Sequence, residues 1–257
     1  MSLRIDLAET FPLLGRAPIV EAVIEVRARA GVAWDESAIS ERLKPKLPEY
    51  PVVESHRGFR HEIRMVPGQP AEQALQDLGW RGLRFESEDK RHIAQFNRDS
   101  FVFSRLTPYV SWEQFQKEGL RLWQLHSELA QPAEAQRLGL RFVNRIPAPV
   151  GEFQLEDYIE ASPRTPRDLD IPLVDYLDRR VLNVPGYPYN VAVIQTVQHP
   201  QGEEAMGVGL ILDIDVFTTT PSSPGRDVVE KRLAEMRWLK NKVFFGSITP
   251  KTLEMLK

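Results

Sequence analysis

The sequence contains no cysteine. This absence excludes disulfide bonds, thiolate zinc sites, cysteine-held iron–sulfur clusters and cysteine nucleophiles. It also fits a reducing compartment, where disulfides are rare. The amino terminus lacks a charged segment followed by an apolar one, and apolar runs such as 208–212 are far shorter than the roughly 20 residues of a membrane span. We therefore expect a cytoplasmic protein with no membrane contact.

The sequence also lacks an excess of either charge. It has 33 basic and 36 acidic residues, a formal net charge of -3. Proteins that coat nucleic acids usually carry a basic excess, so a nucleic-acid partner is not favoured, although a local basic patch is compatible with these totals. Hydrophobic residues make up 42% of the 257 residues, which is enough for a large core without a metal or disulfide staple.

Sequence motifs of catalysis and cofactor binding are missing as well. There is no Gly-x-Ser-x-Gly elbow, no Walker loop, no Gly-x-Gly-x-x-Gly turn and no His-x-x-x-His pair. No cofactor is therefore evident, and whether the chain is an enzyme stays open.

The hydrophobic patterning predicts a strand-rich chain with a few helices. Alternation of apolar and polar residues over 19–30 predicts a strand with one buried face. Further strands are expected at 59–65, 83–87, 92–97, 101–106, 138–146, 190–198 and 206–220, with helices at 35–43, 71–78, 111–130 and 226–245. We predict an α+β fold with an antiparallel sheet and two or three longer helices packed on one face.

Proline is concentrated between residues 147 and 188, which hold seven of the 20 prolines. This predicts an α+β amino-terminal half at 1–147, a connecting segment at 148–189, and a strand hairpin with a helix at 190–257, packed together as one unit. Gly-Leu-Arg-Phe at 82–85 recurs at 139–142. The match is either a coincidence or a trace of two similar halves.

Two pairs of carboxylates are candidate metal ligands. Glu21 and Glu25 are expected on one face of the first strand together with Arg27 and Arg29. Asp213 and Asp215 are two residues apart on another strand and so share a face. Carboxylates arranged in this way can hold a divalent metal beside phosphates. The alternative is an exposed sheet face with cross-strand ion pairs.

A second group of residues is a candidate anion-binding surface. Guanidinium groups pair with phosphate in a bidentate manner, so arginines on neighbouring strands can form such a surface. The alternative is pairing with the abundant acidic residues. The candidates are Arg98, Arg105, Arg141, Asn144 and Arg145.

Four segments resemble a sporadically distributed bacterial family of uncharacterised proteins of about this length. They are Leu14 to Glu25, the central Phe96 to Glu113, the strand Arg137 to Ile146, and the terminal Phe244 to Thr249. The resemblance covers nearly the whole chain. It implies no activity and no catalytic residues, and it suggests mobile genes in a phage-defence context.

Three functions are compatible with these observations. The first is a non-catalytic binding or assembly protein, as a homodimer or with an unidentified protein partner. The second is a metal-dependent enzyme on nucleotides or other phosphorylated substrates, which would require a divalent metal. The third is nucleic-acid binding through the arginine-rich face.

Overall fold

The computed structural model describes residues 3–64, 72–147, 154–160, 175–199 and 208–257. These residues form nine strands, four α-helices and two short 3-10 helices. In chain order they are β1 (Ile19–Arg27), α1 (Glu36–Leu43), η1 (Lys44–Lys46), β2 (Val52–Arg64), β3 (Glu72–Glu86), β4 (His92–Asn97), β5 (Ser100–Leu106), α2 (Trp112–Ala130), β6 (Arg137–Pro147), η2 (Leu155–Asp157), β7 (Leu177–Asn183), β8 (Asn190–Gln198), β9 (Gly209–Thr218), α3 (Arg226–Ser247) and α4 (Pro250–Leu256).

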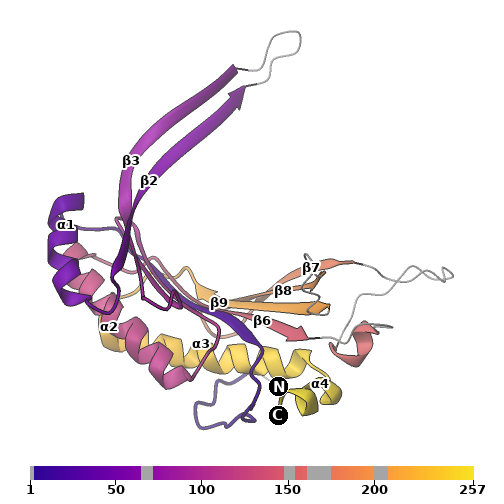
Figure 1. Cartoon of the computed structure of the whole chain (residues 1–257). Coiled ribbons are helices and arrows are strands. Elements are labelled where there is room, and N and C mark those ends of the chain that lie inside the picture. Colours follow the sequence, from indigo (N-terminus) through magenta and orange to yellow (C-terminus); the bar gives the residue numbers. More distant parts are fainter. Residues whose placement is uncertain (1–2, 65–71, 148–153, 161–174, 200–207) are drawn as a thin grey trace.

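The strands form a single antiparallel sheet in the order β2-β3-β4-β5-β1-β6-β9-β8-β7. The helices lie along one face of this curved sheet, and the other face is open on the inside of the curve (Figure 1). The predicted α+β class, with longer helices on one face of an antiparallel sheet, is confirmed. No helix within the described ranges is both long and apolar enough to cross a membrane.

The strand order is similar outward from the centre of the sheet, except that β2 has no counterpart. β1 and β6 pair at the centre; β5, β4, β3 and β2 follow on one side, and β9, β8 and β7 on the other. Each half closes with a long helix, α2 after β5 and α3 after β9. The repeated tetrapeptides lie on β3 and β6, which do not correspond in this arrangement. The similarity of the halves is therefore one of strand order, and the sequence match does not report it.

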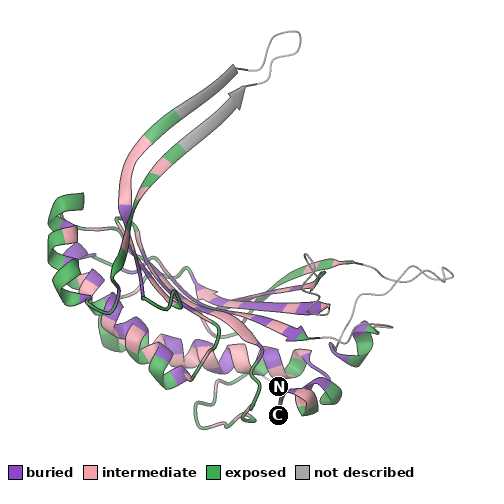
Figure 2. Cartoon of the chain, in the orientation of Figure 1, coloured by how far each residue is buried: buried purple, intermediate pink, exposed green. Residues whose placement is uncertain are grey.

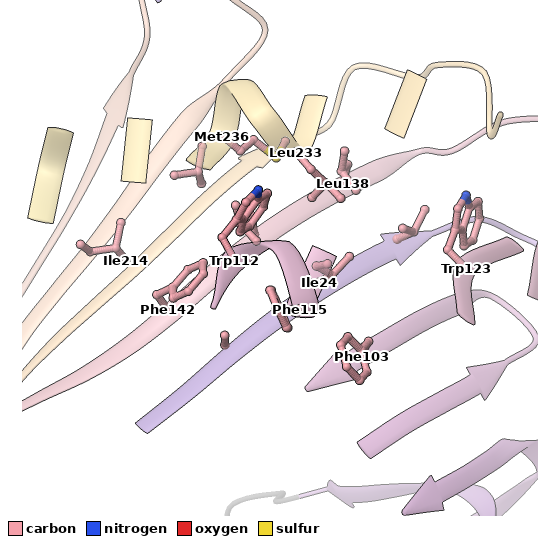
Figure 3. Packing of buried hydrophobic residues seen from close by; sticks show 14 of the residues in the cluster. Ile24, Phe103, Trp112, Phe115, Trp123, Leu138, Phe142, Ile214, Leu233 and Met236 are labelled. Atoms are coloured by element: carbon pink, nitrogen blue, oxygen red, sulfur yellow. The ribbon is translucent and has the colours of Figure 1, made fainter. Parts of the chain in front are cut away.

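The core fills the space between the sheet and the two long helices. Ala22, Ile24 and Val26 alternate with less buried residues on β1 and are almost fully buried, as the alternation predicts. Figure 2 shows this alternation along the strands and the buried inner sides of α2 and α3. Aromatic rings bind the two layers: Phe115 of α2 lies with its ring centroid 6.0 Å from that of Phe142 on β6 (Figure 3). Burying each such side chain contributes about 1.5–3 kcal/mol.

One predicted helix is wrong. Residues 71–78 fall largely within β3, a 15-residue strand paired with β2 along its length. Alanine, glutamine and leucine are good helix formers, but intrinsic propensity is only a weak constraint, and the backbone pairing with β2 outweighs it. The predicted connecting segment 148–189 lies partly outside the described residues, and its described part supplies β7, an edge strand that the sequence did not reveal.

The β2–β3 hairpin extends beyond the rest of the sheet. β4 pairs with β3 only along Gly82–Glu86, so the earlier part of β3 pairs with β2 alone. The result is a two-stranded ribbon that projects from the body (Figure 1). Gly58 lies opposite Gly79, with register shifts on both sides of Gly58. Gly79 has a φ of +80°, a conformation that glycine adopts without strain.

Candidate functional site on the open face of the sheet

Charged side chains gather on the open face of the three central strands, β1, β6 and β9. Because side chains alternate along a strand, the odd-numbered residues of these strands share this face, opposite the helices. The charged residues are Glu21, Glu25 and Arg27 on β1, Arg137, Arg141 and Arg145 on β6, and Asp213 and Asp215 on β9.

Arg137 bridges the two outer strands of this group. Its Nη2 donates to Asp215 Oδ2 at 2.8 Å, and its Nη1 donates to Glu25. Glu25 also accepts from Arg27, whose Nε lies 2.8 Å from Glu25 Oε1. The guanidinium of Arg137 lies over Phe217, 5.0 Å from the ring centroid. These contacts form an ionic ladder across β1, β6 and β9.

A second pair lies beside the ladder. Arg141 holds Asp213 in a bidentate manner, with Nε to Oδ1 at 2.8 Å and Nη2 to Oδ2 at 2.6 Å. The side chain of Asp213 is 8% exposed, whereas that of Arg141 is 48% exposed. The hydrogen bonds to Asp213 raise the pKa of Arg141. Bidentate pairing of this kind is among the strongest polar contacts in proteins.

Burial affects the carboxylate of Asp215 at the β9 end of the ladder. Desolvation raises the pKa of Asp215, and the nearby charge of Glu25 raises it further, while Arg137 opposes both effects. At the rim, the hydrogen bond to Glu25 raises the pKa of Arg27. The guanidinium of Arg137 therefore offsets the repulsion between two carboxylates.

The structure brings the four predicted metal ligands to one face, but it places arginines among them. Glu21 and Glu25 lie on β1 and Asp213 and Asp215 on β9, with the arginines of β6 between these strands. Arg29 lies beyond the end of β1 and is exposed. Within the described ranges, no three histidine, aspartate or glutamate residues are grouped so that they could hold a metal ion. The geometry matches the cross-strand ion pairs that were the alternative interpretation.

The structure does not bring the five predicted anion-binding residues together. Arg141 and Arg145 lie on the open face, where Arg145 Nε donates to Gln198 at 2.8 Å. Asn144, one residue away on the same strand, points to the helix side and donates to Leu212 O at 2.9 Å. Arg105 is also on the helix side, where it donates to Pro108 O at 2.9 Å. Arg98 lies exposed in the turn between β4 and β5.

The projecting ribbon carries an exposed aromatic residue. Phe59 on the projecting ribbon is 57% exposed, and its strand partner Asp77 is paired with Arg57 at 2.8 Å. Isolated two-stranded ribbons are marginally stable in water, so a ribbon of this length gains from further contacts.

Lys240 is a candidate functional residue that was not predicted from the sequence. Lys240 of α3 follows Met236 by four residues and precedes Phe244 by four, which places it on the buried stripe of the helix. It lines a cavity of about 590 Å³ on the helix side of the sheet. The sequence signal that could have identified this residue was a lysine on the apolar stripe of an amphipathic helix.

No family model, no curated protein and no solved structure matches the chain. The resemblance to the sporadic bacterial family stays a prediction.

Proposed function

We propose that the chain is a non-catalytic binding protein that holds a protein partner against the open sheet face and the β2–β3 ribbon. The observation that carries this proposal is the open face itself. Within the described residues it is bare of helices, it adjoins the projecting ribbon that carries the exposed Phe59, and its ionic groups pair with one another.

The charge balance of the face favours a protein over a nucleic acid. The three central strands place four arginines and four carboxylates on this face. Half-buried apolar side chains, namely Val23, Val143 and Ile211, lie among them. Nucleic-acid sites need an excess of cations to replace counterions, whereas protein interfaces combine apolar area with matched charges.

The ribbon supplies the second contact region. Aromatic residues are enriched among the side chains that dominate binding energy at interfaces, and Phe59 is the aromatic residue that the described part of the ribbon exposes most. The Gly58–Gly79 pair allows the ribbon to bend relative to the sheet. Within the described residues, no comparable observation supports the metal-dependent enzyme or the nucleic-acid alternative.

Site-specific photo-cross-linking in the cells that naturally make the chain tests the proposal. A photoreactive phenylalanine analogue is placed at Phe59 or at Ile211, and at the exposed Lys231 of α3 as a control on the opposite side. We expect Phe59 and Ile211 to give the same cross-linked protein species and Lys231 to give none.

The mass of the product identifies the partner. A product of twice the chain mass would make the partner a second copy, and another defined mass would make it a different protein; both support the proposal. A product that nuclease digestion removes would replace it with nucleic-acid binding. Identical cross-linking from Phe59, Ile211 and Lys231, or none from any position, would refute it.

A further inference from the structure

The cavity at Lys240 lies between the sheet, the start of α2, the carboxyl-terminal half of α3 and the amino-terminal segment 7–19. Its volume of about 590 Å³ falls within the range of small-molecule sites. The amino-terminal wall is held to α3 by specific contacts: Trp238 Nε1 donates to Glu9 at 2.9 Å, and Phe11 stacks on Phe245 with centroids 5.7 Å apart. The cavity is therefore a defined feature of the packed structure.

Among the residues that the structure describes, no carboxylate pairs with the ammonium group of Lys240. Its contact among the described residues is the ring of Phe142, whose centroid lies 4.2 Å from Nζ. Burial, together with a smaller contribution from the positive charge of Arg237, lowers the pKa of Lys240 to about 7. Burying an unpaired charge is costly, and an anionic ligand beside it would offset that cost, so Lys240 is a candidate contact for such a ligand.

The other charges around the cavity are already neutralised. Glu9 pairs with Lys242, and Glu113 lies 3.6 Å from Nη2 of Arg237. Arg237 also lies over the ring of Trp112, 5.2 Å from its centroid. The cavity wall thus keeps one uncompensated positive charge, that of Lys240, which matches a ligand with a single negative charge.

A further feature favours an anionic group beside Lys240. α2 begins at the cavity wall with Ser111 as its cap, so the positive end of the helix dipole lies at the cavity.

The remaining wall is apolar and aromatic. Trp112, Phe142 and Trp238 line it together with Phe244 and Phe245. Such walls bind the hydrocarbon part of a ligand, while a few polar groups fix its head.

We propose that this cavity binds a small amphipathic monocarboxylate, with its carboxylate on Lys240 and its apolar body against the aromatic wall. This site is on the helix side of the sheet and is independent of the partner-binding face. A ligand here would contact both the amino-terminal segment and the long helix of the second half.

Decanoate is a suitable probe, and 1-decanol is its uncharged match. Binding is followed by the fluorescence of Trp112 and Trp238, which line the cavity, and by calorimetry. We expect decanoate to bind the native protein more tightly than decanol. Lys240→Met should weaken decanoate binding roughly ten- to hundredfold, because a charge-assisted contact is lost, and should leave decanol binding unchanged.

Control variants separate charge from packing. Lys240→Arg keeps the positive charge and should retain most of the decanoate affinity, and Lys231→Met alters an exposed lysine of the same helix and should change nothing. The other charged or titratable residues that line the cavity are Glu9, Tyr109, Glu113 and Arg237. As Lys240 loses its proton between pH 6 and 9, decanoate affinity should fall in the native protein and stay level in Lys240→Arg.

Melting temperatures of all variants show that each one is folded. Decanoate affinity that is equal in the native protein and in a folded Lys240→Met would overturn the proposal. Equal binding of decanoate and decanol would overturn it as well. Either result would leave the partner-binding proposal untouched, because that proposal depends on the opposite face.

Discussion

On the open face of the sheet, Glu25, Asp213 and Asp215 each contact an arginine of the same chain. On the helix side, Lys240 contacts the ring of Phe142, and within the described residues no carboxylate pairs with it. The first arrangement neutralises charge inside the molecule. The second leaves a charge in an apolar wall, where it costs stability unless something else supplies the counter-charge.

This difference in pairing separates charges that stabilise the fold from a charge that is available to a ligand. Removing a paired arginine should destabilise the fold because its partners lose their counter-charge. Removing an unpaired buried lysine should stabilise it because nothing is left without a partner. The two sides of the sheet should therefore respond to charge removal with opposite signs.

Arg137→Met should have the largest effect. The side chain of Arg137 is 15% exposed, and its loss leaves Glu25 and Asp215 close together without the bridging cation. We expect the free energy of unfolding to fall by roughly 2–4 kcal/mol in urea titrations. Arg179→Met on edge strand β7 is the control, since Arg179 is exposed. A loss no greater than that of the control would show that the ladder is not structural.

Lys240→Met should act in the opposite direction. At pH 6 we expect the free energy of unfolding to rise by about 1–3 kcal/mol. The folded-state pKa of about 7 lies below the unfolded value, so native stability rises as the pH increases through 7 and the advantage of the variant shrinks by pH 9. Urea titrations at both pH values measure this. A variant that is less stable than the native protein at pH 6 would show that Lys240 is a packing residue.

Arg141→Met should have a smaller effect than Arg137→Met. Arg141 is about half exposed, so water replaces part of the lost interaction, but Asp213 is 8% exposed and is left without its bidentate partner. We expect a loss of about 1–2 kcal/mol, measured in the same titrations. The double variant with Asp213→Asn should recover part of it, and no recovery would mean that the pair contributes little net stability.

Phe59→Ala should leave stability nearly unchanged, within about 0.5 kcal/mol, because the side chain is largely exposed. It should nevertheless reduce cross-linking from position 211 in the native cells. Val32→Ala, which shortens another exposed apolar side chain outside β2 and β3, should not. Undiminished cross-linking would place the partner on the sheet without the ribbon.

Alternation within single strands predicted the faces of β1, β6 and β9, including the common face of Asp213 and Asp215. It could not show that β6 lies between β1 and β9, because strand order depends on long-range pairing. The arginines of β6 therefore fell among the carboxylates without any local signal.

Two errors of the sequence-based prediction could have been avoided with local patterns: the grouping of Asn144 with the arginines and the omission of Lys240. Residue parity separates Asn144 from Arg141 and Arg145, so the sequence already contradicted one shared surface for these three residues. Lys240 is half-buried and lies four residues from both Met236 and Phe244, on the helix stripe that the helical period also reveals. The strand at 72–86 could not be predicted from local patterns, because its residues favour a helix and only the pairing with β2 makes them a strand.

The most direct test of the comparison is the pKa of Lys240 itself, measured by NMR of protein labelled at the lysine ε-carbon, with Lys240→Arg to assign the signal. We expect a pKa near 7 in the free protein and a clear rise when decanoate is added, because the carboxylate stabilises the ammonium. An ordinary lysine pKa that decanoate does not change would contradict the account, since Lys240 would then be neither desolvated nor available to an anionic ligand.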